Sequence, residues 1–174
     1  YCAHQTGIIH RDLKPENVFL VEGRLVLADF GIVKAISEDS PLGPEAANPL
    51  TEVIGTPGFM SLEQLRGDPL GAYTDIYSIG ALLYFLSTGE MAYDTSSPYR
   101  LAQQIQSEPL IPPDVRRPIL SKAFSALVEH AMQAFPARRP AHCEEYRQDM
   151  AALLKERRVT DVREELRRFT ADPE

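Results

Sequence analysis

The sequence predicts a mainly α-helical domain with one small β-hairpin. Apolar residues recur at helical spacing through most of the second half of the chain. Near the N-terminus, two short apolar runs flank a Glu-Gly pair, which is the pattern of a hairpin. With 174 residues, of which 44% are hydrophobic and 25% charged, the chain has the size and composition of a folded domain with its own core.

The first thirty residues are expected to hold the end of a helix and the hairpin. Gly7 is a helix stop signal, because glycine readily takes the left-handed conformation at which many helices end. Val18–Leu20 and Leu25–Leu27 are the two expected strands. From Gly31 to Pro57 no period is sustained, so we expect a long loop, a feature that in compact domains usually serves function.

Helices are expected from Ser61 onward. Ser61, followed three residues later by Gln64, is a capping-box pattern that should begin a short helix. Thr74–Thr88 is apolar around its whole circumference, which is typical of a buried helix. Further helical stripes are expected after Ser97-Pro98, from Phe124 to Phe135 ahead of Pro136, and from Tyr146 to Leu154.

The apolar stripe changes phase near the C-terminus. After Arg157 it continues through Val159, Val162, Leu166 and Phe169, between charged residues. We therefore expect one domain over residues 1–158 and a charged helical tail or linker over residues 159–174. No internal repeat occurs.

Residues 10–17, which read His-Arg-Asp-Leu-Lys-Pro-Glu-Asn, carry the strongest chemical signal. They closely resemble the catalytic loop of protein kinases, and the lysine is typical of the serine/threonine class. Phosphoryl transfer to a hydroxyl needs a carboxylate to orient the alcohol and accept its proton, a cation at the transferring phosphate, and an oxygen ligand for Mg²⁺. The resemblance implies that Asp12, Lys14 and Asn17 take these three roles.

The tripeptide Asp29-Phe30-Gly31 directly follows the second expected strand. Alone it is a weak signal, but it follows Asp12 by 17 residues across the expected hairpin, which makes it strong. It resembles the kinase segment whose aspartate binds the Mg²⁺ that bridges the ATP phosphates. The resemblance implies that Lys14, Asn17 and Asp29 bind ATP and Mg²⁺, with Asn17 and Asp29 as the metal ligands.

Residues 55–63, Gly-Thr-Pro-Gly-Phe-Met-Ser-Leu-Glu, resemble the end of the kinase activation segment. This resemblance places Thr56 beside Asp12 and Lys14 as a third catalytic residue. The family usually ends this stretch in Ala-Pro-Glu, so the Ser-Leu-Glu of this chain keeps the glutamate and loses the proline.

Two acidic residues are expected to support the site. In the family, the residue matching Glu63 pairs with the one matching Arg139 in a buried structural ion pair. Asp75 opens the buried helix, where it either complements the helix dipole or, as the resemblance to the family implies, accepts backbone N–H bonds from the loop near His10 and Arg11. The apolar surroundings favour the second interpretation.

Arg11, directly before the expected catalytic aspartate, marks kinases that are switched by phosphorylation of the activation loop. The candidate phosphorylation sites are Ser37, Ser40 and Thr51, of which Thr51 is favoured. The histidines at positions 4, 130 and 142 show no ligand spacing and are interpreted as surface or packing residues, and His10 as a packing residue beneath Phe30.

Three family elements do not occur in the sequence: the Gly-rich phosphate loop, the strand with its Val-Ala-Ile-Lys-type lysine, and the helix with the partner glutamate. The chain resembles the eukaryotic-like serine/threonine kinases of bacteria over residues 1–157, which implies a kinase C-terminal lobe without its N-terminal lobe. The start at Tyr1 favours a fragment. We expect the parent protein to transfer phosphate from ATP to Ser/Thr hydroxyls of proteins, and the chain alone to be inactive without the N-terminal lobe of the same polypeptide.

Two alternatives come from other classes: a non-catalytic kinase-lobe interaction module, and a small-molecule phosphotransferase of the aminoglycoside or choline kinase type. The second class lacks the Gly55-Thr56-Pro57 segment.

The net charge of −7 argues against nucleic-acid binding, and the apolar run Ile76–Leu86 is too short to cross a bilayer. No signal peptide or CxxC pair occurs, so a cytoplasmic location is expected.

Overall fold

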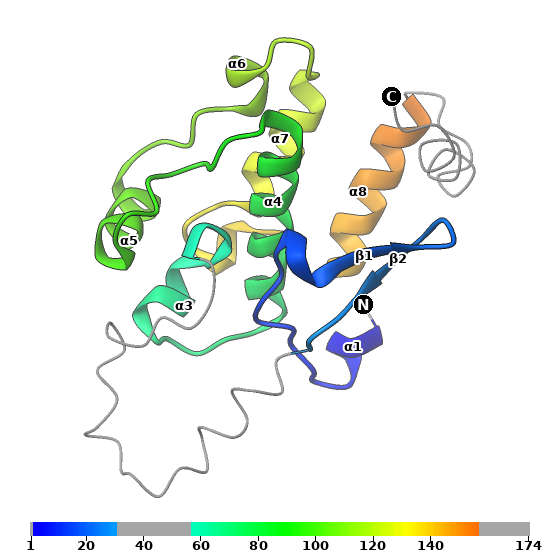
Figure 1. Cartoon of the computed structure of the whole chain (residues 1–174), viewed down its shortest axis with the longest axis horizontal. Coiled ribbons are helices and arrows are strands. Elements are labelled where there is room, and N and C mark those ends of the chain that lie inside the picture. Colours follow the sequence, from blue (N-terminus) through cyan, green and yellow to red (C-terminus); the bar gives the residue numbers. More distant parts are fainter. Residues whose placement is uncertain (1, 31–56, 157–174) are drawn as a thin grey trace, which may run out of the picture.

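A computed structural model describes residues 2–30 and 57–156 of the chain (Figure 1). Within these ranges the regular secondary structure is helical, apart from one two-stranded antiparallel sheet. The predicted mainly α fold with a small hairpin is therefore confirmed. The elements are α1 (Cys2–Gln5), the 3₁₀ helix η1 (Pro15–Asn17), β1 (Val18–Val21), β2 (Arg24–Leu27), η2 (Pro57–Phe59), α3 (Leu62–Arg66), α4 (Ala72–Thr88), α5 (Pro98–Ser107), α6 (Pro113–Arg116), α7 (Lys122–Ala131), η3 (Pro136–Arg138) and α8 (Cys143–Glu156).

Helix α4 is the centre of the molecule. It packs against α7, α8, α6 and η2, and nine of its 17 residues are buried. It begins at Ala72, two residues before the predicted start, and ends at Thr88. The next residue, Gly89, has a left-handed φ of 78°, a conformation that glycine adopts without strain. The prediction of a helix buried on most sides is therefore confirmed, and the helix gives its neighbours a common surface to cover.

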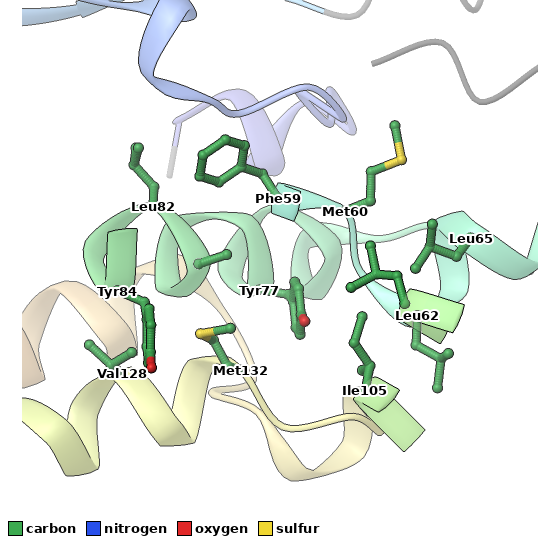
Figure 2. Packing of buried hydrophobic residues seen from close by; sticks show 12 residues of the cluster. Phe59, Met60, Leu62, Leu65, Tyr77, Leu82, Tyr84, Ile105, Val128 and Met132 are labelled. Carbon is green, nitrogen blue, oxygen red and sulfur yellow. The ribbon is translucent and has the colours of Figure 1, made fainter. Parts of the chain in front are cut away.

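The main core lies around α4, between η2, α3, α5 and α7. Figure 2 shows Tyr84, Val128 and Met132 gathered where α4 faces α7, while Phe59 and Leu82 lie on the other side of the same helix. A smaller cluster, formed by Ile76, Ala131 and Tyr146, joins α4 and α7 to α8.

Gly80 lets α4 and α7 approach each other closely. A Cβ atom at this position would lie 2.8 Å from the Cβ of Ala131 and 2.8 Å from the Cγ of Met132. Both distances are far below ordinary van der Waals contact. Any larger residue at position 80 would therefore force the two helices apart.

The hairpin joins β1 and β2 in a register that pairs Val18 with Leu27 and Phe19 with Val26. Glu22 and Gly23 both have positive φ, at 50° and 70°, as the tight turn of a two-residue hairpin requires. Each strand is one residue longer than predicted. Because side chains alternate between the faces of a sheet, Phe19, Val21 and Val26 share one face, and 49%, 52% and 45% of their surfaces are exposed.

Helix α7 is shorter than the sequence predicts, since it ends at Ala131 rather than Phe135. The reason is a contact with the segment that follows the helix. The Arg139 side chain donates from Nε to the carbonyl of Gln133 over 2.7 Å and from Nη2 to that of Ala134 over 2.9 Å. These carbonyls are satisfied by a side chain, so the helix need not continue to satisfy them. The short α6 was not predicted either.

In the part of the chain that the structure describes, no helix has both the length and the apolar character needed to cross a bilayer.

We predict that the exposed face of the hairpin is the main site at which the 174-residue chain binds the apolar dye ANS. Replacing Phe19 and Val26 by threonine keeps the strand preference but removes most of that apolar surface, so ANS fluorescence should fall several-fold while far-UV circular dichroism is unchanged. The control is Val115→Thr on α6, which is 65% exposed and should leave ANS binding as it is. An equal loss in the control variant would contradict the prediction.

Candidate active site

The loop before β1 brings three predicted site residues together. Lys14 Nζ lies 2.9 Å from Asp12 Oδ2. The Asn17 amide nitrogen donates to the carbonyl oxygen of Asp12 over 2.7 Å and to its Oδ2 over 3.2 Å. Asn17 itself is buried at the end of η1, which begins at Pro15. The Asp12 carboxylate is thus fixed from two sides, by a cation and by an amide.

A buried carboxylate supports this loop from beneath. Asp75, in the first turn of α4, accepts the backbone N–H of His10 at Oδ2 and that of Arg11 at Oδ1, both over 2.9 Å. The prediction that Asp75 binds the backbone of the loop is therefore confirmed. Arg11 has a φ of 68°, which costs a non-glycine residue energy and persists only where the surroundings hold it.

His4 is a supporting residue whose part in the site the sequence interpretation missed. Its Nε2 donates to Asp75 Oδ2 over 2.7 Å, and its side chain is only 13% exposed. It therefore packs in the interior and also forms a specific polar contact. The two residues are 71 positions apart, and no local pattern signals such a pair.

The second chemical segment lies beside the first. The N–H of Ala28 donates to the carbonyl of Asn17 over 2.9 Å, so Asp29 follows at the end of the hairpin where Asn17 lies. Phe30 packs on His10 with the ring centroids 4.7 Å apart, as expected, and His10 Nε2 donates to the Ala28 carbonyl over 2.9 Å.

The donor set at this end of the hairpin fits Mg²⁺. Asn17 engages Asp12 through its amide nitrogen, and within residues 2–30 and 57–156 its Oδ1 accepts no hydrogen bond. The Asp29 carboxylate is exposed. Mg²⁺ prefers oxygen ligands and is usually held by one or two protein groups together with phosphates and waters. In the same ranges no group of three His, Cys, Asp or Glu side chains could hold a metal ion.

Several predicted residues lie outside the described part of the chain. These are the catalytic candidate Thr56 and the phosphorylation candidates Ser37, Ser40 and Thr51. Residues 159–174, the expected tail, also lie outside it, so the domain boundary at 158 stays a prediction.

The predicted ion pair between Glu63 and Arg139 is confirmed. Two parallel bonds join the side chains, at 2.7 and 2.9 Å, and 5% or less of either residue is exposed. The Thr74 hydroxyl donates to Glu63 Oε1 over 3.1 Å, and Arg139 also donates to the Tyr73 carbonyl. The guanidinium lies 5.0 Å from the centroid of the Tyr77 ring. The pair thus fastens α3 to the start of α4.

Burial alone would raise the pKa of the Glu63 carboxyl, but the hydrogen bonds and positive charge of Arg139 outweigh it. The pKa of Glu63 therefore lies below its ordinary value of 4.5.

The chain belongs to the protein kinase domain family, which it matches over residues 1–151. Members of this family generally use ATP and a divalent metal ion, and phosphorylate proteins.

Among individual proteins, the chain is similar to serine/threonine kinases of bacteria. It is 39% identical over 166 residues to the serine/threonine-protein kinase pkn3 of Myxococcus xanthus, covering 91% of this chain and 30% of that protein. It is 39% identical over 149 residues to PknB of Mycobacterium leprae, covering 85% of this chain and 23% of that protein. For PknB of Mycobacterium tuberculosis the identity is 38% over 152 residues, covering 87% and 24%. The chain thus spans about a quarter to a third of the length of these relatives.

Glu63→Gln should lower the free energy of unfolding of the chain at pH 7 by about 3–5 kcal/mol, because it leaves the buried Arg139 without a counter-charge. A group with a lowered pKa stabilises the fold fully above its unfolded value and loses this effect as the pH falls through its folded value. The difference between wild type and variant should therefore shrink as the pH falls below 4.5.

Urea unfolding followed by far-UV circular dichroism, at pH 7 and at steps below pH 4.5, measures this difference. Glu144→Gln, at the i,i+3 pair with the exposed Arg147, is the control and should leave the free energy of unfolding at pH 7 close to that of wild type. Equal losses for the two variants would contradict the assignment.

Proposed function

We propose that the protein transfers the terminal phosphoryl group of ATP to serine or threonine hydroxyls of other proteins. The observation that carries this proposal is the Asp12 carboxylate, held by Lys14 at 2.9 Å and by Asn17 at 3.2 Å. The carboxylate orients the substrate hydroxyl and accepts its proton at Oδ1 or Oδ2 as the new P–O bond forms and the bond to ADP breaks. The similarity to pkn3 and PknB supports the serine/threonine class.

The other site residues serve the phosphates. Lys14, beside Asp12, places a positive charge where the transferring phosphoryl group passes and so offsets the charge that develops there. Asn17 Oδ1 and the Asp29 carboxylate would hold Mg²⁺, which when bound neutralises charge on the phosphate oxygens. Thr56 is proposed to hydrogen-bond Asp12 and Lys14.

The substrate, partner and location complete the proposal. The substrate is a protein, and the N-terminal lobe of a kinase is the partner that completes the nucleotide site. A cytoplasmic site of action is the location that we infer for this domain. A non-catalytic interaction module is the alternative, because the Gly-rich loop and its lysine do not occur in these 174 residues.

In the full-length protein, Asp12→Asn and Asp29→Asn should each reduce turnover by a hundredfold or more, on the order of the loss of one catalytic group. The reasons differ. The first variant loses the proton acceptor and should keep its affinity for Mg·ATP, whereas the second loses a metal ligand and should bind Mg·ATP more weakly. Phosphate transfer to a protein substrate and titration with a fluorescent ATP analogue separate the two effects.

The matched control is Asp149→Asn on the exposed side of α8, which should change neither quantity. Turnover that survives in the Asp12 variant would remove Asp12 from the role of proton acceptor, whereas wild-type protein without any turnover would favour the non-catalytic module. Unchanged nucleotide affinity in the Asp29 variant would remove that residue from the metal site.

The 174-residue chain by itself should neither hydrolyse ATP nor transfer phosphate at a kinase-like rate. Phosphoryl transfer depends on positioning and charge stabilisation, and this chain carries only one side of the nucleotide site. Incubation of the purified chain with radiolabelled ATP and Mg²⁺ tests this. Autophosphorylation that Asp12→Asn abolishes would overturn it.

A further inference from the structure

Arg11 is held at both of its backbone polar groups. Its N–H is bound by Asp75 Oδ1 over 2.9 Å, and its carbonyl oxygen accepts a hydrogen bond from Gln64 Nε2 over 2.7 Å. The residue has a left-handed φ of 68° and directly precedes Asp12. Its conformation therefore sets the direction in which the chain presents the Asp12 side chain.

The Gln64 amide is itself fixed at its other end. Gln64 is the third residue of α3, and its Oε1 accepts the backbone N–H of Ser61 over 3.1 Å and the Ser61 hydroxyl over 3.3 Å. The backbone N–H of Gln64 in turn donates to Ser61 Oγ, which completes a capping box. With the oxygen held in this way, the amide nitrogen points at the carbonyl of Arg11.

We propose that Gln64 is a positioning residue for Asp12, which couples the start of α3 to the strained peptide of Arg11. The proposal rests on the catalytic role assigned to Asp12 above. Two residues separate η2 from α3, so a displacement of η2 would reach Asp12 through the Gln64 side chain.

A capping role alone does not explain the choice of glutamine. Glutamate serves equally well at the third position of a capping box, because the cap needs only an oxygen acceptor. The contact with Arg11 needs a donor, and of these two residues glutamine alone supplies it at neutral pH. Glutamate would turn an oxygen with negative charge toward the carbonyl of Arg11. Gln64→Glu therefore removes the proposed function and keeps the cap.

The test uses full-length protein with Gln64→Glu and Gln64→Ala. In Gln64→Glu the amides of residues 10–13 should exchange with deuterium about tenfold faster while those of α3 stay protected, as expected for a local loss of one buried hydrogen bond. Turnover should fall roughly ten- to a hundredfold, with the KM for ATP changed less than about threefold, because the proton acceptor is misplaced and the nucleotide contacts are kept. Gln64→Ala should lose as much turnover, and the amides of α3 should also exchange faster, because this variant loses the cap as well.

Gln104→Glu is the matched control. The Gln104 amide also bridges two partners, accepting the N–H of Asp94 over 3.0 Å and donating to Glu108 over 3.1 Å, but it lies on α5. It should leave the exchange of residues 10–13 and the turnover as in wild type.

Wild-type exchange and turnover in Gln64→Glu, with a loss only in Gln64→Ala, would overturn the proposal and leave Gln64 as a helix cap. If wild-type protein shows no phosphoryl transfer at all, the proposed function fails. The exchange of residues 10–13 then still decides whether Gln64 holds the loop.

Discussion

A carboxylate inside a protein is costly unless donors surround it, and the carboxylate of Asp75 finds three. Two are backbone N–H groups of the loop that carries Asp12, and the third is the imidazole of His4. The loop before β1 is thus bonded to the central helix α4. The contacts of Asp12 with Lys14 and Asn17 depend on this attachment, because a free loop would not keep Arg11 in its left-handed conformation.

The ion pair between Glu63 and Arg139 is the second fixed point. Its desolvation is offset by the additional hydrogen bonds that both side chains make, which is the condition under which a buried pair is tolerated. Because Glu63 and Gln64 are neighbours, α3 is fastened on one side to the start of α4 and on the other to the backbone of Arg11, in the loop before β1. The short helix α3 therefore connects the buried ion pair to the loop that carries Asp12.

Features set by neighbouring residues could be predicted from the sequence. The hairpin, the capping box at Ser61 and the buried helix α4 follow from turn residues and periodicity. The interpretation of residues 10–17 as a catalytic loop comes from their resemblance to the kinase family, and the roles of its residues stay predictions. Contacts between distant segments could not be predicted in this way. The hydrogen bond of His4 with Asp75 and that of Gln64 with Arg11 are the examples, since no pattern along the chain records which side chains folding brings together. The early end of α7 was missed for another reason, because it depends on the Arg139 side chain folding back on carbonyls five and six residues earlier.

Because Gly80 has no side chain, the packing of α4 against α7 also affects the position of the loop before β1. Gly80 and Asp75 both lie on α4, about 7.5 Å apart along the helix axis at 1.5 Å per residue. A methyl group at position 80 would clash with Ala131 and Met132 and displace α4 from α7. The displacement would carry Asp75 with it, and through Asp75 the peptides of His10 and Arg11. The absence of a side chain at Gly80, where α4 meets α7, therefore helps to fix the position of the Asp12 carboxylate.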